Sequence, residues 1–258
     1  MNRPVGILLF AVCVVLFSLH SVFGQCVIDS VPLKKISLLE AKTRLARKYV
    51  NRQNEEKFPL AAKLGEKGWF SVNLRPYCNI NLFSKEGRTC PPQFHQMKLG
   101  RQHFYGVPFD IISPQDNDNK TALGLPSTRF LTRELPASAT VPVGKKAGVL
   151  YFLHTTYFTS RGGKQYYIIN YDDGTQARIR FVGTVHSGDW YHQSTRVYTD
   201  DVHYVLVPSS KGATLHHRNM HIFQWKNPSP EKGIKSITFQ SDPKAEMAIF
   251  VVGVTGHP

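Results

Sequence analysis

The sequence predicts an all-β fold, a jelly-roll β-sandwich with a short α-helical N-terminal extension. Between residue 69 and the end of the chain, about ten short segments are rich in β-branched and aromatic residues and are separated by turn residues. No regular alternation of strand and helix interrupts them, which excludes a doubly wound parallel sheet. The composition, 41% hydrophobic and 12% aromatic, supports a packed core and excludes a disordered chain.

The strands are expected within one domain, residues 68–258. The clearest pair flanks Asp172-Asp173-Gly174, because Asp-Gly suits the positive φ angles of a hairpin turn. The predicted strands are residues 69–74, 105–111, 121–125, 150–158, 166–171, 177–182, 202–207, 215–225, 234–239 and 247–254.

Residues 25–67 are predicted to form the basic helical extension. Within residues 36–52, apolar side chains recur at helical spacing and basic side chains occupy the opposite face. Such a pattern is typical of a helix that packs on a domain and leaves its charged face in solvent. Docking of the basic face on a polyanion is the alternative.

Residues 1–24 have the pattern of a secretory signal peptide. Arg3 precedes an apolar run over residues 5–19, and compact residues at 22–24 suit cleavage before Gln25. We therefore expect the protein to be secreted and extracellular. An uncleaved anchor is the alternative, since residues 5–23 approach the ~20 residues that span a bilayer.

The chain is strongly basic. Its 258 residues include 32 Lys and Arg against 18 Asp and Glu, a net charge of +14, and removal of Arg3 with the signal peptide leaves 31 − 18 = +13. This charge favours glycans, acidic or sulfated ones especially, and anionic matrix components as partners. We expect neither a nucleic acid nor a membrane as the partner outside the cell.

Three cysteines remain after removal of the signal peptide, namely Cys26, Cys78 and Cys90. Any pairing of the three is compatible with an oxidising compartment. We favour a Cys78–Cys90 disulfide because the Asn, Gly and Pro residues between them are typical of a loop. Cys26 is then left for an intermolecular bridge or is a buried free thiol.

Several sequence segments resemble those of a known family. They include residues 69–79, 105–112, 141–155, 166–174, 188–190 and 223–230. Their order and spacing, from about Trp69 to Gly256, resemble a galactose-binding-like jelly-roll module of the kind attached to secreted glycoside hydrolases. The resemblance implies this fold and a glycan-binding ancestry. Because no catalytic domain accompanies the module in this chain, we expect a non-catalytic protein.

A loop at residues 187–192 is the best candidate for a sugar site. Aromatic rings stack on the apolar face of a pyranose, and polar side chains hydrogen-bond to its hydroxyl groups. Trp190 buried as a core residue, and His154 as a satisfied interior histidine, are the alternatives. The candidate ligand-binding residues are Asp189, Trp190, Tyr191 and His192 of the loop, together with His154 at the end of a neighbouring strand.

Catalytic and metal motifs are weak in this sequence. Asp172 and Asp173 are adjacent, so their side chains diverge and do not form a glycosidase pair. His217 and His221 have zinc-like spacing only if they lie on a helix, whereas the surrounding pattern predicts a strand. We therefore predict no metal ligands and no required cofactor.

One loop is rich in oxygen-bearing side chains, at residues 116–119. It permits a structural calcium ion but lacks the Gly and distal Glu of an EF-hand loop, so a polar turn is the simpler interpretation. Asn119-Lys120-Thr121 is an N-glycosylation sequon, and we predict a glycan on Asn119.

Three functions agree with these observations. The leading one is a secreted, carbohydrate-binding protein that acts without catalysis in a polysaccharide-rich extracellular matrix such as a shell, cuticle or mucus layer. The second is a structural matrix protein that binds acidic partners by charge alone. The third is a small glycan-cleaving enzyme.

Overall fold

The computed structural model describes residues 52–83, 94, 96–129, 135–159, 164–191, 196–208, 217–242 and 244–258. The predicted signal peptide, most of the basic extension and two of the cysteines, Cys26 and Cys90, lie outside these residues. Among the described helices, none has the length and apolar character needed to cross a membrane.

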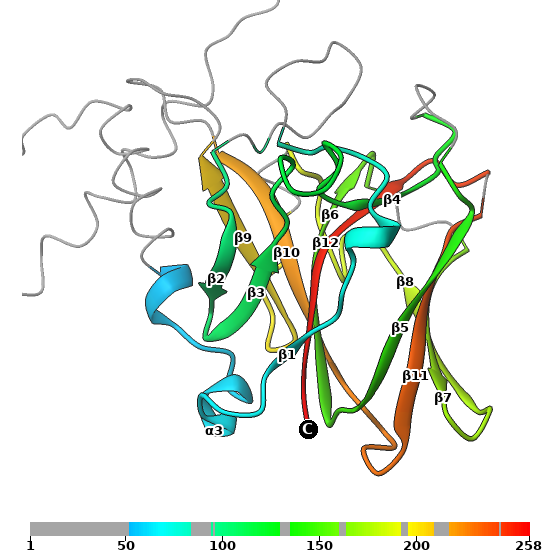
Figure 1. Ribbon diagram of the computed structural model, residues 1–258. Helices are drawn as coiled ribbons and strands as arrows, with labels where there is room; N and C mark the ends of the chain where they lie inside the picture. The colour runs from blue at the N-terminus through cyan, green and yellow to red at the C-terminus, as the bar shows by residue number, and fades with distance from the viewer. Residues whose placement is uncertain are drawn as a thin grey trace, which may run out of the picture. The chain divides into compact units, whose positions relative to one another are not determined.

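The described chain consists of β-strands with little helix (Figure 1). The first elements are α3 (Ala61–Leu64), β1 (Phe70–Ser71), η1 (Arg75–Tyr77), β2 (Gly100–Phe104), β3 (Val107–Ile111) and β4 (Leu123–Leu125). The remaining strands are β5 (Ser138–Lys146), β6 (Val149–Tyr157), β7 (Gln165–Tyr171), β8 (Gln176–Phe181), β9 (Val202–Pro208), β10 (His217–Lys226), β11 (Gly233–Gln240) and β12 (Ala248–His257).

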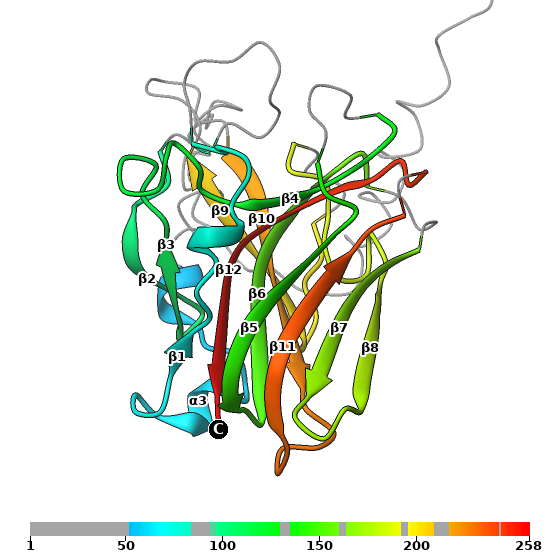
Figure 2. The same cartoon turned by 45° about the vertical axis from the view of Figure 1, so that its right-hand side comes forward.

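Two antiparallel sheets pack face to face and form a β-sandwich (Figure 2). One sheet has the order β1-β12-β6-β10-β9, with β4 paired to β12, and the other has the order β5-β11-β7-β8. Aromatic side chains fill the space between them: Phe152 of β6 contacts the rings of Tyr167 and Phe239 from the opposite sheet. This apolar layer buries the inward-facing residues of both sheets, which is the arrangement expected of a sandwich.

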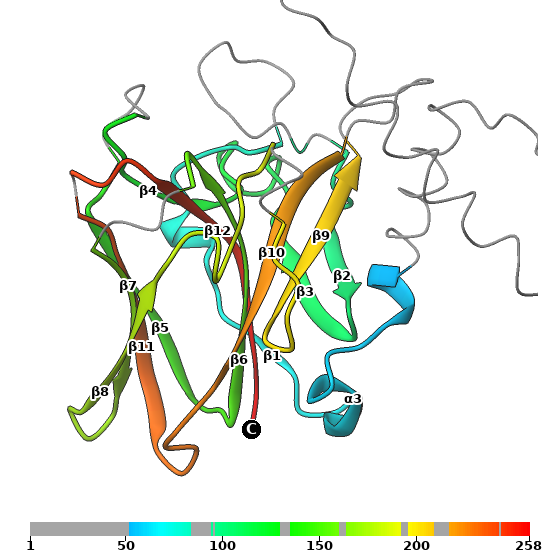
Figure 3. The same ribbon diagram turned by 180° about the vertical axis from the view of Figure 1, so that it is seen from behind.

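A third layer covers the other face of the six-stranded sheet. The β2–β3 hairpin and the segment that begins at residue 52 lie on this face (Figure 3). Phe58, Tyr105 and Phe109 from this layer are buried against Tyr151 of β6 and Phe250 of β12. Burial on both faces explains why β6 and β12 are almost continuously buried instead of alternating.

The all-β sandwich predicted from the sequence is confirmed, and nearly all predicted strands are present. The hairpin turn is also as expected, because Gly174 has a φ of 84° and its N–H donates to the carbonyl of Tyr171. Two strands were missed, β2 and β5. Pro142 and Gly144 within β5 argue against a strand, but β5 lies at a sheet edge, where proline is tolerated. The expected strand at residues 69–74 is shorter, since η1 follows β1 closely.

Candidate functional site

The described part of the candidate loop, residues 187–191, is tied to the six-stranded sheet. The backbone N–H of Trp190 donates to the carbonyl of Thr156, and the N–H of Asn219 donates to the carbonyl of Trp190. Asp189 is buried, and its carboxylate accepts backbone N–H groups from Phe158 at 3.1 Å and from Tyr191 at 2.9 Å. The carboxylate therefore holds the backbone of the loop in place, which differs from the ligand contact expected for it.

Replacing Asp189 with Ala should destabilise the fold. The change removes the acceptor of the Phe158 and Tyr191 N–H groups, and a hydrogen bond to a charged group contributes about 1.5–3 kcal/mol. We expect Asp189→Ala to lower the free energy of unfolding by about 2–4 kcal/mol in urea titration. The exposed Asp200→Ala is the control and should change it by less than ~0.5 kcal/mol; equal effects of the two variants contradict the role given to Asp189.

Trp190, Tyr191 and Arg218 form a contiguous group, which we call the Trp190 cluster. The guanidinium carbon of Arg218 lies 4.8 Å from the ring centroid of Trp190 and 4.7 Å from that of Tyr191. Trp190 is partly buried and packs against the apolar core, whereas Tyr191 is 52% exposed. Arg218 was not identified from the sequence, although a charged residue within an otherwise buried strand was the available signal.

Two hydrogen-bond donors of the Trp190 cluster find no acceptor among the described residues. Trp190 Nε1 and Arg218 Nε are both shielded from solvent and make no hydrogen bond in the described part of the chain. Burial also lowers the pKa of the Arg218 guanidinium. Unsatisfied buried donors are rare in folded proteins and mark places where an acceptor can be gained. The cluster therefore combines the exposed ring of Tyr191 with two shielded donors, which a hydroxyl, carboxylate or sulfate oxygen entering the cluster would satisfy.

Of the other two predicted site residues, His154 lies elsewhere in the described part of the chain. His154 does not line a surface cleft, because its side chain is fully buried between the two sheets. Its position follows from register: His154 lies opposite His221 on β10 and faces the same apolar layer as Phe152. His192 lies outside the described residues.

His154 and His221 instead belong to an interior polar network. His154 Nε2 lies 2.9 Å from the carbonyl oxygen of His186, and His154 Nδ1 lies 3.1 Å from the hydroxyl of Tyr167. Around His221, the backbone N–H groups of Gly188 and Val197 approach the two ring nitrogens at 3.2 and 3.3 Å. Burial lowers the pKa of His154 to about 3 and that of His221 well below its ordinary value. Both rings are therefore neutral structural groups.

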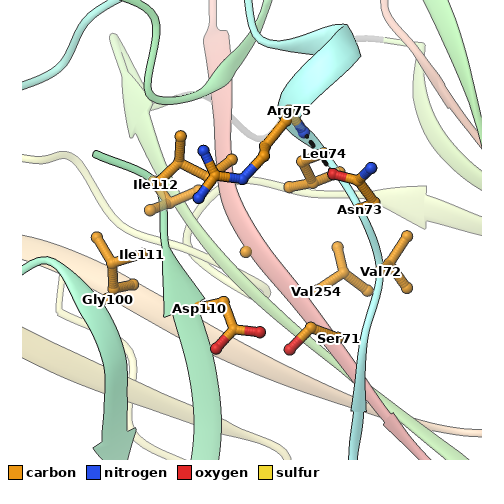
Figure 4. A pocket seen from close by; sticks show the side chains of 12 residues that line it. Ser71, Val72, Asn73, Leu74, Arg75, Gly100, Asp110, Ile111, Ile112 and Val254 are labelled. Atoms are coloured by element: carbon orange, nitrogen blue, oxygen red, sulfur yellow. Dashed lines mark hydrogen bonds between the residues drawn. The ribbon is translucent and has the colours of Figure 1, made fainter. Parts of the chain in front are cut away.

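A separate pocket of about 330 Å³ lies between the segment that follows β1 and strand β3, with β12 beneath it (Figure 4). Figure 4 shows Arg75 extending across one end and Asp110 and Ser71 facing each other at the other end. Arg101 donates to both Asp110 and Ser71 at 2.9 Å. Partial burial raises the pKa of Asp110, but hydrogen bonds with Ser71 and Arg101 outweigh it and bring the pKa below its usual value.

The polar groups at this pocket thus satisfy one another, whereas the Trp190 cluster contains unsatisfied donors. The size of the pocket is at the lower end of the range typical of small-ligand sites. No single stretch of sequence indicated it, because its walls come from distant segments.

Cys78 is buried and forms no disulfide within the described part of the chain, and burial raises the pKa of its thiol to about 12. Its predicted partner Cys90 lies outside the described residues, so the disulfide stays a prediction. The predicted glycosylation site Asn119 is exposed, at a positive φ of 57°, which suits a surface turn.

Metal-binding groups do not gather in the described part of the chain: it contains no group of three or more His, Cys, Asp or Glu residues placed to hold an ion. His217 and His221 lie on strand β10, as the sequence pattern predicted, and so lack the helical spacing of a zinc site. In the oxygen-rich loop at residues 116–119, the Asn117 amide donates to the carbonyls of Arg75 and Lys120 and stabilises a polar turn.

Comparison of the chain with protein-family models, with curated proteins and with solved structures found no match.

Proposed function

We propose that this protein is a secreted, non-catalytic carbohydrate-binding β-sandwich that acts in a polysaccharide-rich extracellular matrix. The signal-peptide pattern, the basic charge and the resemblance to galactose-binding-like modules support this proposal. The observation that carries it is the Trp190 cluster, in which an exposed tyrosine ring lies beside an arginine with an unsatisfied donor.

The chemistry of the Trp190 cluster fits a sugar that bears an anionic group. The exposed ring of Tyr191 can stack on the apolar face of a pyranose, which buries area worth about 25 cal/mol per Å². Arg218 offers N–H groups that donate in pairs to a carboxylate or a sulfate. Among the described residues, no carboxylate forms an ion pair with Arg218, so its charge is not already neutralised.

The test is binding of the secreted protein to an array of neutral, uronate-bearing and sulfated glycans. Tyr191→Ala and Arg218→Gln should each weaken the best ligand about tenfold, the effect of losing one stacking contact or one charge-assisted hydrogen bond. Tyr191→Phe keeps the ring and should bind nearly as well as the parent protein. Val185→Ala alters an equally exposed apolar residue nearby and should have no effect.

Two outcomes argue against this function. If the protein binds no glycan on the array, the proposed carbohydrate-binding function is wrong. The second outcome is that the parent protein and both cluster variants bind acidic ligands equally and lose them at moderate salt. This result supports the charge-mediated matrix protein instead, since exposed charges are screened beyond ~10 Å at 0.1 M salt.

A further inference from the structure

The four-stranded sheet has an outer face that no other described layer covers (Figure 2). The pairing register places three side chains of each strand on this face, opposite the side chains that enter the core. We call these twelve residues the outer face: Ser138, Thr140 and Pro142 of β5, Ser236, Thr238 and Gln240 of β11, Tyr166, Ile168 and Asn170 of β7, and Gln176, Arg178 and Arg180 of β8.

A chain of side-chain hydrogen bonds crosses the outer face from one edge strand to the other. The hydroxyls of Thr140 and Thr238 lie 2.8 Å apart, and the Asn170 amide donates to both Thr238 and Ser236 at 3.0 Å. The Gln176 amide then donates to the side-chain oxygen of Asn170 at 2.8 Å. These bonds hold hydroxyl and amide groups in fixed orientations on a sheet surface, so a ligand that binds them does not have to order them first.

Two arginines lie at one side of this row. Arg178 and Arg180 point to the same side of β8, about 7 Å apart along the strand. The guanidinium of Arg178 lies 4.9 Å from the ring centroid of Tyr166, which fixes its plane on the surface. Among the described residues, neither arginine forms an ion pair with a carboxylate.

The outer face contains no acidic residue, which distinguishes it from an ordinary solvated sheet face of mixed charge. The nearest carboxylates in sequence belong to Asp172 and Asp173 in the β7–β8 turn and to Asp242 after β11; Asp173 pairs with Lys232 at 2.7 Å, and Asp242 accepts the backbone N–H of Lys244. A flat, basic face rich in hydroxyl and amide groups complements a polymer that carries both anionic groups and hydroxyls.

We propose that the outer face binds a sulfated polysaccharide chain laid across the four strands. Arg178 and Arg180 pair with sulfate oxygens, because the guanidinium group donates two parallel hydrogen bonds to such an anion. The side chains of Thr140, Thr238 and Asn170 exchange hydrogen bonds with the sugar hydroxyls. This surface is separate from the Trp190 cluster, and the proposal does not depend on sugar binding there.

The test uses heparin as the probe, by titration calorimetry and by salt elution from a heparin column. The double variant Arg178→Gln/Arg180→Gln should weaken heparin binding at least tenfold and elute at lower salt. The double variant Lys98→Gln/Lys120→Gln removes the same charge from exposed lysines outside this face and should change the affinity less than twofold. Equal losses in the two double variants, or no loss in the arginine variant, overturn the proposal.

Two further variants separate specific recognition from net charge. Arg178→Lys/Arg180→Lys keeps both charges but removes the planar donor pairs, so we expect an intermediate loss of affinity. Thr238→Val removes the central hydroxyl of the hydrogen-bonded row without altering charge and should weaken binding severalfold, with unfolding midpoints confirming that the variant is folded.

Heparin binding by Tyr191→Ala distinguishes this inference from the proposed function. Unchanged heparin affinity in Tyr191→Ala, with a loss in the arginine double variant, places the sulfated chain on the outer face whether or not the Trp190 cluster binds a sugar. A loss in Tyr191→Ala alone assigns heparin to the Trp190 cluster and refutes a role for the outer face.

Discussion

Lowering the pH from 7.5 to 4.5 is expected to remove about 5 kcal/mol of stability from the sandwich, through His154 and His221 alone. This is comparable with the whole free energy of unfolding of many domains, so unfolding near pH 4.5 is the expected result. The reason lies in the partners of these two rings, both of which are fully buried.

His154 has one acceptor and one donor as neighbours. The carbonyl of His186 accepts a hydrogen bond from the N–H at Nε2, and the hydroxyl of Tyr167 can donate to Nδ1, which matches the neutral ring. The protonated ring carries N–H groups on both nitrogens, so the Tyr167 hydroxyl has to turn around. Burial disfavours the charge further and brings the pKa of His154 to about 3.

His221 is still less suited to protonation. Backbone N–H groups of Gly188 and Val197 face its two ring nitrogens, so an imidazolium meets donors on both sides. Burial is the largest cause of its lowered pKa, and nearby His154 and Arg196 lower it further.

The direction of the pH effect follows from these lowered values. Below a pH of about 6.5, the pKa of histidine in the unfolded chain, these two histidines bind protons in the unfolded chain but not in the folded one. Stability therefore falls as the pH falls. The loss is about 1.4 kcal/mol per pH unit for each histidine, and for His154 it continues down to a pH of about 3. Guanidinium unfolding curves at half-unit steps between pH 7.5 and 4.5 measure this slope.

Single variants test whether His154 and His221 cause the change of stability with pH. His221→Asn cannot take up the proton, so its slope between pH 6 and pH 5 should be smaller than that of the parent protein by about 1.4 kcal/mol per pH unit. His103→Asn alters an exposed histidine on β2 and should leave the slope unchanged. Stability that stays constant from pH 7.5 to pH 5 contradicts the buried neutral state of both rings.

The sequence predicted the sandwich well because its local signals are strong. The Asp-Gly turn after β7 and the long apolar run of β6 each indicate their element without reference to the rest of the chain. The third layer was not predicted. Its contacts join Phe58 to side chains about 45 to 145 residues away along the chain, such as Tyr105, Tyr151 and His203, and no local pattern encodes such pairs.

The candidate site was predicted less completely, and for a physical reason. The sequence identified Trp190 and Tyr191 as aromatic residues in a turn, but it does not indicate which strand packs against them, so Arg218 was missed. His154 was a candidate ligand-binding residue because it lies near the end of a long predicted strand, with a satisfied interior histidine as the alternative. Its pairing with His221 places it in the core instead, because alternate residues of a strand face opposite sides of the sheet and a shift of one position changes the face.

Phe58→Ala is expected to cost about 3–5 kcal/mol, the range for removing a buried phenylalanine from a packed core. Phe58 is fully buried on the outer side of the six-stranded sheet. Its ring stacks on His203 at 3.8 Å and contacts the edges of Tyr105 and Tyr151. Part of the predicted extension is thus an integral layer of the sandwich.

The contacts around Phe58 extend into a longer stack that anchors the same segment. His203 stacks on Tyr198 at 4.4 Å, and the Arg52 guanidinium lies 4.3 Å from the Tyr198 ring. Beside them, the Gln53 amide donates to the carbonyl of Leu206 and accepts its N–H, which covers an otherwise open backbone position on edge strand β9. Loss of Phe58 should therefore loosen the whole segment and expose the edge of β9.

Two measurements test this expectation. Urea unfolding gives the loss of stability, and amide hydrogen exchange at Leu206 reports whether the edge of β9 has opened. Leu60→Ala and Leu64→Ala change partly buried residues of the same segment and should each cost about 1.5 kcal/mol, less than Phe58→Ala, because less apolar surface leaves the core. If Phe58→Ala unfolds like these controls and Leu206 stays protected, the segment rests on the sandwich without stabilising it.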